Sequence, residues 1–404
     1  MKKISVLLLV FILLTFAVGC AEDAAVAGEH TSLSTQVHES ENATPNDTVF
    51  PPDDVVSFLA VGDNIIYNGQ LREGKKNAEG NPDYEGEYDF RPMYQNVKDI
   101  ISDADIAFVN QETVMSERFE PSQYPDFNSP QELGENLVET GFDVISIATN
   151  HMLDMGYDGL VDTIEFWKTQ KVVTVGGYTD KQDFLTVRFI EKNGIKIAFV
   201  AFTYSPARAE GKPAFIPTIE EELIKEWMAK ANEESDFTVV SMHWFKDEYN
   251  QTPNEKQKHY AQILADSGAD VILGHHPHCL QPIEWIEGEG GNKTLCFYSL
   301  GNFTSETDET VSLVGGIAQF DIVKNERTGM RIENITFTPT VMDYRNSFNK
   351  NTVYLLSEYT DEMCKSHNIV SYFGQELSMD MLCNYVSNAI DKKYLPKSYL
   401  DTLS

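Results

Sequence analysis

The chain has 404 residues, of which 42% are hydrophobic, and it carries 63 acidic against 31 basic side chains, giving a formal net charge of −32. This length is enough for one large domain or two, each with a buried core. The negative charge excludes nucleic acid and anionic lipid surfaces as partners, because both would be repelled. An anionic substrate would need cations bound locally.

The N-terminus predicts a secreted, lipid-anchored protein. Residues 1–20 begin with two lysines after the initiator, continue through an apolar stretch from Ile4 to Val18 and end at Cys20. The apolar stretch is too short for a comfortable membrane span and is typical of a signal peptide. The residues Ala-Val-Gly before Cys20 resemble a bacterial lipobox, in which the cysteine is lipidated. The alternative is ordinary cleavage nearby with a free Cys20.

Residues 21–54 contain no Lys or Arg and are rich in small, polar and acidic residues. Such a segment cannot bury enough apolar surface to fold, so we expect a disordered acidic tether. The predicted location is therefore the extracytoplasmic face of the cell membrane, with the lipid as the contact to the membrane.

Strands and helices alternate along the rest of the chain. Apolar runs bounded by turn residues predict buried strands at 55–62, 105–110, 142–148, 172–175, 237–242 and 269–273. Helices are expected at 91–102, 130–141, 156–168, 217–233, 254–267 and over 351–395. Antiparallel pairs are expected at 187–191 with 195–202, joined by Asn193-Gly194, at 284–286 with 294–299, and at 311–323 with 330–338. This order predicts two packed sheets covered by helices.

Three histidines stand directly after the predicted strand at 269–273. Gly274 is expected to turn the chain away from the strand end, and Pro277 to hold His276 and His278 in a fixed relation. Ligands of open α/β sheets bind at the carboxyl ends of strands, and histidine is the commonest metal ligand. The alternative interpretation is a polar loop with surplus histidines.

Polar side chains also follow the other predicted strands. The set is Asp63, Asn110 with Glu112, Asn150 with His151, His243, and His276 with His278. Strand ends at one edge of a sheet lie close together, so these residues are expected to form one pocket. Carboxylate, amide and imidazole donors suit Zn, Mn or Fe better than Ca, and a bridging carboxylate can hold two such ions for phosphoester hydrolysis. Each residue alone could instead hold a turn or fill a structural role.

Six motifs carry a resemblance to a known family. They are Ala60-Val-Gly-Asp63, Asn110-Gln-Glu112, Ala148-Thr-Asn-His-Met-Leu-Asp154-Met-Gly156, His243-Trp244 with Glu248-Tyr249, Gly274-His-His-Pro-His278 with Gln281-Pro282, and Tyr298-Ser-Leu-Gly-Asn302-Phe303. In this order they resemble the bacterial capsule-synthesis CapA / poly-γ-glutamate biosynthesis protein family. The resemblance implies an α/β fold, a four-layer α-β-β-α sandwich like the metallophosphatases (calcineurin-like phosphoesterases). We expect this domain at 55–345, followed by a C-terminal helical appendage at 346–404.

The resemblance also implies residue roles. Asp63, Glu112, Asn150, His243, His276 and His278 would be the metal ligands. Glu112 would bridge one or two divalent transition-metal ions, Mn, Zn or Fe, and His151 with Asp154 would act as the general acid. One departure stands out, because Ile65 occupies the position where calcineurin-like enzymes carry a histidine ligand. Asn64 could partly replace that ligand through its amide oxygen.

Three residues are expected to contact the substrate, namely Asn110, Asn302 and Arg208, although a surface position is the more usual one for an arginine such as Arg208. The predicted function is synthesis or export of poly-γ-glutamate or a related capsule polymer, with hydrolysis of a phosphoester or amide. Its partners would be this anionic polymer or substrate and the membrane proteins of capsule synthesis. The alternatives are a non-catalytic accessory that binds polymer or partner proteins, and a phosphodiesterase or nucleotidase unrelated to capsule.

Overall fold

The structure, a computed structural model, describes residues 53–205 and 215–403. Residues 52–404 form one compact unit, so the C-terminal segment belongs to the same body as the rest. The predicted signal peptide, Cys20, most of the tether and Arg208 lie outside the described residues. Among the described residues, no helix is long and apolar enough to cross a membrane.

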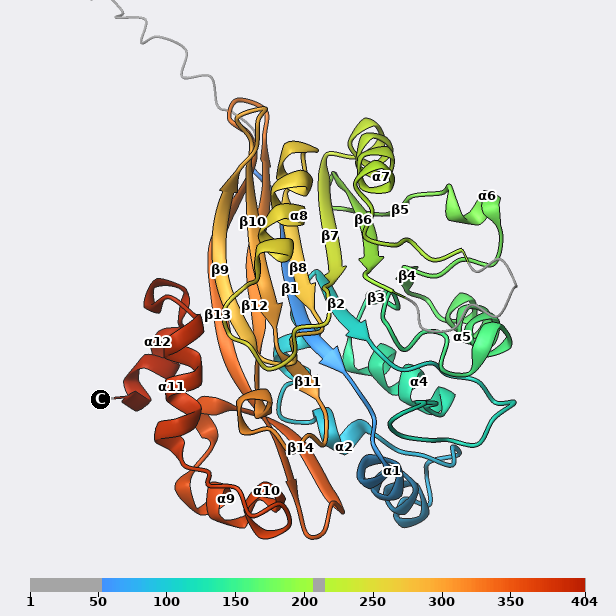
Figure 1. The fold of residues 1–404 in the computed structure, drawn as a ribbon, viewed down its shortest axis with the longest axis vertical. Coiled ribbons are helices and arrows are strands. Elements are labelled where there is room, and N and C mark those ends of the chain that lie inside the picture. The colour runs from blue at the N-terminus through green and yellow to red at the C-terminus, as the bar shows by residue number, and fades with distance from the viewer. Residues whose placement is uncertain (1–52, 206–214, 404) are drawn as a thin grey trace, which may run out of the picture. The chain divides into compact units, whose positions relative to one another are not determined.

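Two sheets form the centre of the unit (Figure 1). The first sheet has the order β14-β13-β12-β1-β2-β3-β4, with the short β11 also paired to β1, and the second has the order β5-β6-β7-β8-β10-β9. The first sheet consists of β1 (Asp54–Asn64), β2 (Ile106–Gln111), β3 (Val144–Ser146), β4 (Val173–Val175), β11 (Asn302–Thr304), β12 (Val314–Asn325), β13 (Gly329–Arg345) and β14 (Lys350–Leu355). The second consists of β5 (Arg188–Lys192), β6 (Ile195–Thr203), β7 (Phe237–His243), β8 (Val271–His275), β9 (Leu280–Glu287) and β10 (Lys293–Leu300).

Each sheet combines parallel and antiparallel strands: the first is antiparallel at its β14 side and parallel at its β4 side, and the second has a parallel centre with antiparallel edges. Strands β1 to β4 are parallel neighbours, as are β6, β7, β8 and β10. Strands β12 to β14 and the pairs β5–β6 and β9–β10 are antiparallel. The carboxyl ends of β1, β2 and β3 therefore meet at one edge, as do those of β7 and β8.

The alternation of side chains along β6 shows how the layers are made. Ile197, Phe199 and Ala201 belong to the core between the sheets, whereas the intervening residues pack into a second core on the outer face. Phe58 of β1 stacks on Phe199 across the interface, with ring centroids 6.3 Å apart. Successive strand residues point to opposite faces, so a continuous apolar run fills two cores at once.

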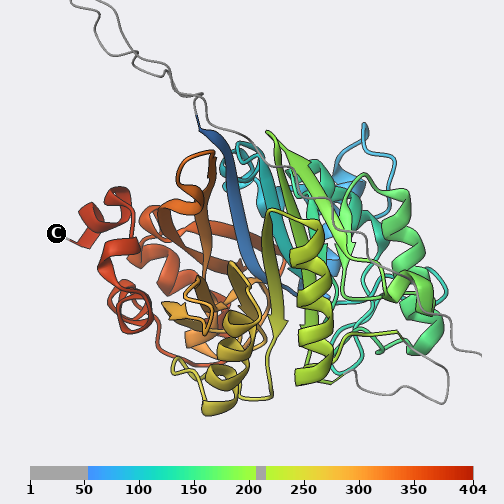
Figure 2. The ribbon, with the colours of Figure 1, turned by 90° about the horizontal axis from the view of Figure 1, so that it is seen from above.

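Helices cover the outer faces of both sheets (Figure 2). Helices α7 (Glu221–Glu234) and α8 (Glu255–Asp266) pack their apolar residues into the outer core of the second sheet. The first sheet is accompanied by α1 (Asn68–Gly80), α2 (Arg91–Tyr94), α3 (Lys98–Ser102), α4 (Gln131–Thr140) and α5 (Gly156–Thr169). The remaining helices are α6 (Lys181–Phe184), α9 (Asp361–Ser366), α10 (Asn368–Ser371), α11 (Met379–Ala389) and α12 (Lys397–Leu400). The predicted four-layer α-β-β-α sandwich is confirmed.

The C-terminal segment corrects one prediction. Residues 351–355 were expected to begin a helix, but they form β14, which pairs with β13 at the edge of the first sheet. The helices that follow bury residues such as Leu382 and Tyr399 in the same hydrophobic cluster as the strands of the first sheet. The segment is therefore packed against the fold.

Candidate metal centre

The predicted ligands meet beneath one cavity, although they come from both sheets. Asp63 lies on β1, Glu112 follows β2 and Asn150 follows β3, all in the first sheet. His243 ends β7, and His276 and His278 follow β8, in the second sheet. Two groups have ligand atoms within 4.8 Å of one another, namely Glu112 with His243 and His276, and Asp63 with Glu112 and His278.

Glu112 is the residue that both groups share. Its Oε1 lies 3.9 Å from His243 Nε2 and 3.9 Å from His278 Nε2. These distances are too long for hydrogen bonds. They suit two donors on one cation, because ligand atoms about 2.1 Å from an ion lie roughly 3–4 Å from each other.

Unpaired buried atoms test whether a cation fits here. Both carboxylate oxygens of Glu112 and both ring nitrogens of His276 are buried without a hydrogen-bond partner among the described residues. Leaving such groups unsatisfied costs about 1–3 kcal/mol each. A divalent cation would satisfy the oxygens of Glu112 and one nitrogen of His276, so the residues present fit a metal.

The protonation states agree with ligand chemistry for two of the histidines. Burial, together with the neighbouring His278, lowers the pKa of His276 to about 3, and burial with His276 lowers the pKa of His243 well below its usual value. Both imidazoles are therefore neutral and offer a lone pair, as a metal requires.

The carboxylates and His278 shift the pKa values of one another. Burial raises the pKa of Glu112 to about 7. Burial alone would lower the pKa of His278, but Glu112 and Asp63 together raise it to about 10. Burial would likewise raise the pKa of Asp63, but hydrogen bonds from His275 and His278 bring it well below its usual range. A bound cation would take the place of the proton that the two carboxylates hold on His278.

The loop that carries the histidines has an unusual backbone. His276 and His278 both have positive φ angles, 86° and 55°, which non-glycine residues rarely adopt. The backbone N–H of Tyr249 donates to the Pro277 carbonyl at 2.8 Å and ties this loop to its neighbour. Strained conformations of this kind persist where surrounding contacts fix them, and they orient the two imidazoles.

Gly274 does not make the turn that was predicted for it. It lies within β8, and the chain turns at His276. A side chain at Gly274 would lie 2.0 Å from the Tyr298 carbonyl oxygen and 2.4 Å from Nε1 of Trp244. The glycine is needed because the neighbouring strand and the indole approach closely.

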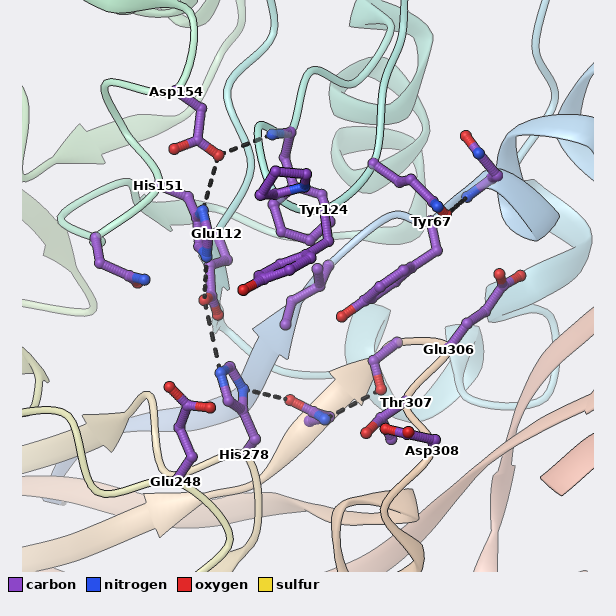
Figure 3. Close-up of a pocket in the computed structure, with 18 of the residues that line it drawn as sticks. Tyr67, Glu112, Tyr124, His151, Asp154, Glu248, His278, Glu306, Thr307 and Asp308 are labelled. Atoms are coloured by element: carbon purple, nitrogen blue, oxygen red, sulfur yellow. Dashed lines mark hydrogen bonds and ion pairs between the residues drawn. The ribbon is translucent and has the colours of Figure 1, made fainter. Parts of the chain in front are cut away.

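His151 and Asp154 form the pair that was expected. Nδ1 of His151 lies 2.7 Å from Oδ2 of Asp154, which also accepts the Phe127 backbone N–H at 2.8 Å. Nε2 of His151 faces Oε1 of Glu112 at 4.0 Å (Figure 3). Burial lowers the pKa of His151, but the Asp154 hydrogen bond and the charge of Glu112 outweigh it and raise that pKa. The role of general acid stays a prediction.

The three predicted substrate contacts lie in different places. Asn302 lines the cavity, and its Oδ1 lies 2.9 Å from Nδ1 of His278. Asn110 is fully buried and donates from Nδ2 to Asp63 Oδ1 at 2.8 Å, so it orients a ligand from behind instead of touching substrate. Arg208 lies outside the described residues.

The position that departs from the calcineurin-like pattern remains without a donor. Ile65 lines the cavity with an apolar side chain. The amide of Asn64 cannot replace the ligand, because its Oδ1 accepts from the Tyr94 hydroxyl at 2.9 Å and from Thr304 Oγ1 at 2.8 Å. Its Nδ2 donates to Gln111. The group of Asp63, Glu112 and His278 therefore gains no ligand atom from residues 64 and 65 and is expected to bind a cation more weakly than the group of Glu112, His243 and His276.

The sequence did not single out His275 as a site residue. It is fully buried, its ring stacks on Phe108, and its Nδ1 lies 3.3 Å from Asp63 Oδ1. His275 thus faces the core between the sheets and supports Asp63 from below. The only sequence signal was its place in the histidine cluster.

The cavity above these residues measures about 1080 Å³. Besides His151, His276 and His278, its lining is rich in tyrosines and carboxylates, among them Tyr67, Tyr124, Tyr204, Tyr249, Glu248, Glu306 and Asp308. Figure 3 shows Tyr67 and Tyr124 projecting their rings toward the space in front of Glu112 and His278. The arrangement can hold a ligand larger than a single small group.

Comparison with known proteins shows the family of the chain. Residues 57–307 match the family described as Bacterial capsule synthesis protein PGA_cap. The chain is 32% identical over 217 residues to the PGA biosynthesis protein CapA of Bacillus subtilis, covering 51% of this chain and 55% of that protein. It is 30% identical over 206 residues to the capsule biosynthesis protein CapA of Bacillus anthracis, covering 49% and 48%.

The chain thus matches about half the length of these curated relatives. Among solved structures, the NAD nucleotidase of Haemophilus influenzae aligns with a TM-score of 0.44 and 13% identity, covering 87% of this chain and 58% of that one. A likeness of this size assigns no function.

Proposed function

The chain belongs to the bacterial capsule synthesis protein family, and from this premise we propose that it is a lipid-anchored, metal-dependent hydrolase of the phosphoesterase type. Its role would lie in the synthesis or export of poly-γ-glutamate or a related capsule polymer, as the names of its relatives suggest. The observation that carries the proposal is the meeting of two ligand groups at Glu112 beneath one cavity.

The proposed cofactors are one or two ions of Mn, Zn or Fe. Glu112, His243 and His276 would hold one ion, with the Asn150 amide, which lies 2.7 Å from His243 Nε2, beside them. The group of Asp63, Glu112 and His278 would hold the other, more weakly, since Ile65 offers no donor. When bound, such ions supply Lewis acidity and bring the pKa of coordinated water near neutrality.

The chain's own residues supply the proton and the geometry. Asp154 accepts from Nδ1 of His151 and leaves Nε2 pointing toward Glu112 and the cavity. A proton held at Nε2 is therefore placed to reach the oxygen of a departing alcohol, which is the work of a general acid. The ring of Phe127 meets His151 edge-on at 4.8 Å and fixes its plane.

The membrane location rests on the N-terminal sequence. The signal stretch and Cys20 support lipidation and display on the extracytoplasmic face. Capsule synthesis proteins of the same membrane are the proposed partners. Labelling with a radioactive fatty acid, compared between wild type and Cys20→Ser, tests the anchor directly, and an unlabelled wild-type protein would overturn it.

The hydrolase proposal is tested by metal content and turnover together. Wild type, Glu112→Gln and His276→Ala would be analysed for bound elements and for cleavage of a generic phosphodiester and a γ-glutamyl oligomer. We expect a transition metal and turnover in wild type and a loss of both in the variants. His259→Ala is the matched control, because this histidine is exposed on α8, away from the cavity.

Two other outcomes would point to the alternative functions. A wild-type protein that binds no metal, with a melting curve that chelator leaves unchanged, would favour a non-catalytic accessory. Cleavage of nucleotides with no action on the γ-glutamyl oligomer would favour a phosphodiesterase unrelated to capsule.

A further inference from the structure

Glu248 lines the cavity but belongs to neither ligand group. It lies on the loop between β7 and α8, a few residues after His243. Its side chain is 32% exposed, whereas that of the neighbouring His276 is 1% exposed. Glu248 therefore meets the buried imidazole from the side of the cavity.

The distance between these two side chains suits two ligands of one cation. Oε1 of Glu248 lies 3.8 Å from Nε2 of His276, and among the described residues no other carboxylate oxygen is paired with this imidazole. The separation is too long for a hydrogen bond. It is close to the 3.9 Å between Glu112 and His243, which a cation with donors about 2.1 Å away would bridge.

Backbone hydrogen bonds tie the loop between β7 and α8 to the loop of the histidines. The N–H of Trp244 donates to the His275 carbonyl at 3.1 Å. The N–H of Tyr249 donates to the Pro277 carbonyl at 2.8 Å. The two bonds reach the residues on either side of His276. The glutamate between these anchors is thereby held next to the imidazole.

The backbone next to Glu248 has a rare conformation. Tyr249 has a φ of 63°, in the left-handed region that non-glycine residues seldom adopt. Its ring lies 6.2 Å from that of His278. Figure 3 shows the side chain of Glu248 rising from this loop into the space beside His278. Strain of this kind persists where the surrounding contacts fix it, and here it sets the direction of the carboxylate.

Tyr204 shows that Glu248 and Glu112 act on one space. Its ring centroid lies 5.0 Å from that of His276. Burial raises the pKa of the Tyr204 hydroxyl, and the charges of Glu248 and Glu112 raise it further. Both carboxylates therefore lie within electrostatic reach of the ring that covers the imidazole.

The charge of the donors leaves room for another carboxylate. Glu112, His243 and His276, here called the first ligand group, contain one carboxylate and two imidazoles, and the other group shares that carboxylate. One negative charge does not balance a divalent cation in a buried site, where an uncompensated charge is costly. Glu248 would supply the second negative charge.

We propose that Glu248 is a further metal ligand, which completes the first ligand group from the side of the cavity. The inference rests on the proposed function for the presence of an ion, and it deepens that function by naming a ligand that neither group contains. The alternative role is to orient His276 by accepting a hydrogen bond, which the separation of 3.8 Å does not support.

The affinity of the metal-free protein for Zn or Mn tests the proposal without any substrate. Competition with a chelating dye would give the Kd of the tighter ion in wild type and in Glu248→Gln. Loss of a residue that only orients a ligand costs about 10- to 100-fold, so direct ligation predicts a rise in Kd of more than about 100-fold. Asp308→Asn is the matched control, because it removes an exposed carboxylate from the same cavity and should leave the Kd unchanged.

Replacement of Glu248 by His tests the contact with the ion directly. Cu²⁺ binds nitrogen and oxygen donors tightly, and pulsed electron paramagnetic resonance counts the imidazoles bound to it. With one equivalent of Cu²⁺, wild type should show the two imidazoles of the first ligand group, and Glu248→His should show a third. Asp308→His adds an imidazole elsewhere in the cavity and should leave the count at two.

The outcomes separate this proposal from the metal centre itself. Tight metal binding in wild type, with either an unchanged Kd in Glu248→Gln or a count of two in Glu248→His, would overturn the role of Glu248 and leave the metal centre standing. A wild-type protein that binds no transition metal would overturn the metal centre and Glu248 as its ligand together.

Discussion

At the residue scale, the site depends on buried polar side chains that have no hydrogen-bond partner among the described residues. The oxygens of Glu112 and the nitrogens of His276 are buried and have no hydrogen-bond partner among the described residues, as expected where a ligand takes up these bonds. Neighbouring polar residues orient the other site residues through hydrogen bonds. The pairs are Asn110 with Asp63, Asn302 with His278 and Asp154 with His151.

Replacement of His151 by Asn should separate chemistry from metal binding. We expect kcat to fall about 10²- to 10⁴-fold, the usual contribution of general acid catalysis. Bound metal, measured by elemental analysis, should stay at the wild-type amount, because His151 belongs to neither ligand group. Equal losses of metal and turnover would contradict the assignment of His151 as an acid.

Asp270 offers a test of pH dependence away from the site. Burial raises the pKa of Asp270 to about 7, although its Oδ2 accepts the Thr238 backbone N–H at 2.8 Å. An unfolded Asp has a pKa of about 3.9, so the folded state holds the proton more tightly between about pH 4 and pH 7. The contribution of this group to stability is therefore present below about pH 4 and is lost as the pH rises to about 7.

Asp270→Asn keeps the acceptor and removes the charge. The variant should gain about 2 kcal/mol of unfolding free energy at pH 8, less than the full shift would give because the side chain keeps some solvent contact. Near pH 4 the gain should vanish. Urea denaturation at both values measures it, and an equal gain at the two would show that the charge of Asp270 is not the cause.

The sequence could predict which residues belong to the site where those residues follow strands. Asp63, Glu112, His243 and His276 each lie at or just after the carboxyl end of a strand, so the sequence could place them at strand ends. Other features of the site depend on residues that are distant in the chain. His275 contacts Asp63, and the Oδ1 of Asn64 accepts hydrogen bonds from Tyr94 and Thr304. No local pattern records such contacts.

At the element scale, elements with local signals were predicted well. The hairpin of β5 and β6 forms at Asn193-Gly194, with φ angles of 48° and 75°, as its sequence predicted. Helix α4 ends at Gly141 in the left-handed conformation, also as predicted. Helix α1 was not predicted. The residues that it buries are mostly small or polar, including Gly69, Gly74 and Ala78, so they do not form the repeating apolar pattern from which a helix is predicted.

The hairpin glycine should be sensitive to substitution. Gly194→Ala should lower the unfolding free energy by about 1 kcal/mol, because alanine is disfavoured at a φ of +75°. Gly80→Ala is the matched control, since Gly80 lies at the end of a helix with open space around it and should be neutral or stabilising. Thermal melting compares the two, and equal effects would show that backbone conformation does not decide the outcome.

At the scale of the whole molecule, the two sheets are joined by apolar packing and by the ligand groups. The proposed ions would touch Asp63 and Glu112 from the first sheet and His243 and His276 from the second. The division into two sheets could be predicted from the order of elements. The edge strand β14 could not, because residues 350–355 are short and form a strand only by pairing with β13.

Removal of metal should therefore destabilise the whole unit. Chelator should lower the Tm of wild type. Added Mn or Zn at 100 times its Kd should raise the unfolding free energy of the metal-free protein by about 2.7 kcal/mol and restore the Tm. Glu112→Gln should respond to neither treatment, while His259→Ala should respond as wild type does. A wild-type Tm that ignores both chelator and metal would contradict a cation at the junction of the sheets.

The division of the donors has a practical consequence. Neither sheet holds a complete set, so a fragment or a mispaired folding intermediate that contains only one of them would present half of the coordination sphere. Tight cation uptake would then report that both halves have docked correctly, which makes a metallochromic dye a quality check for refolded preparations that needs no knowledge of the substrate.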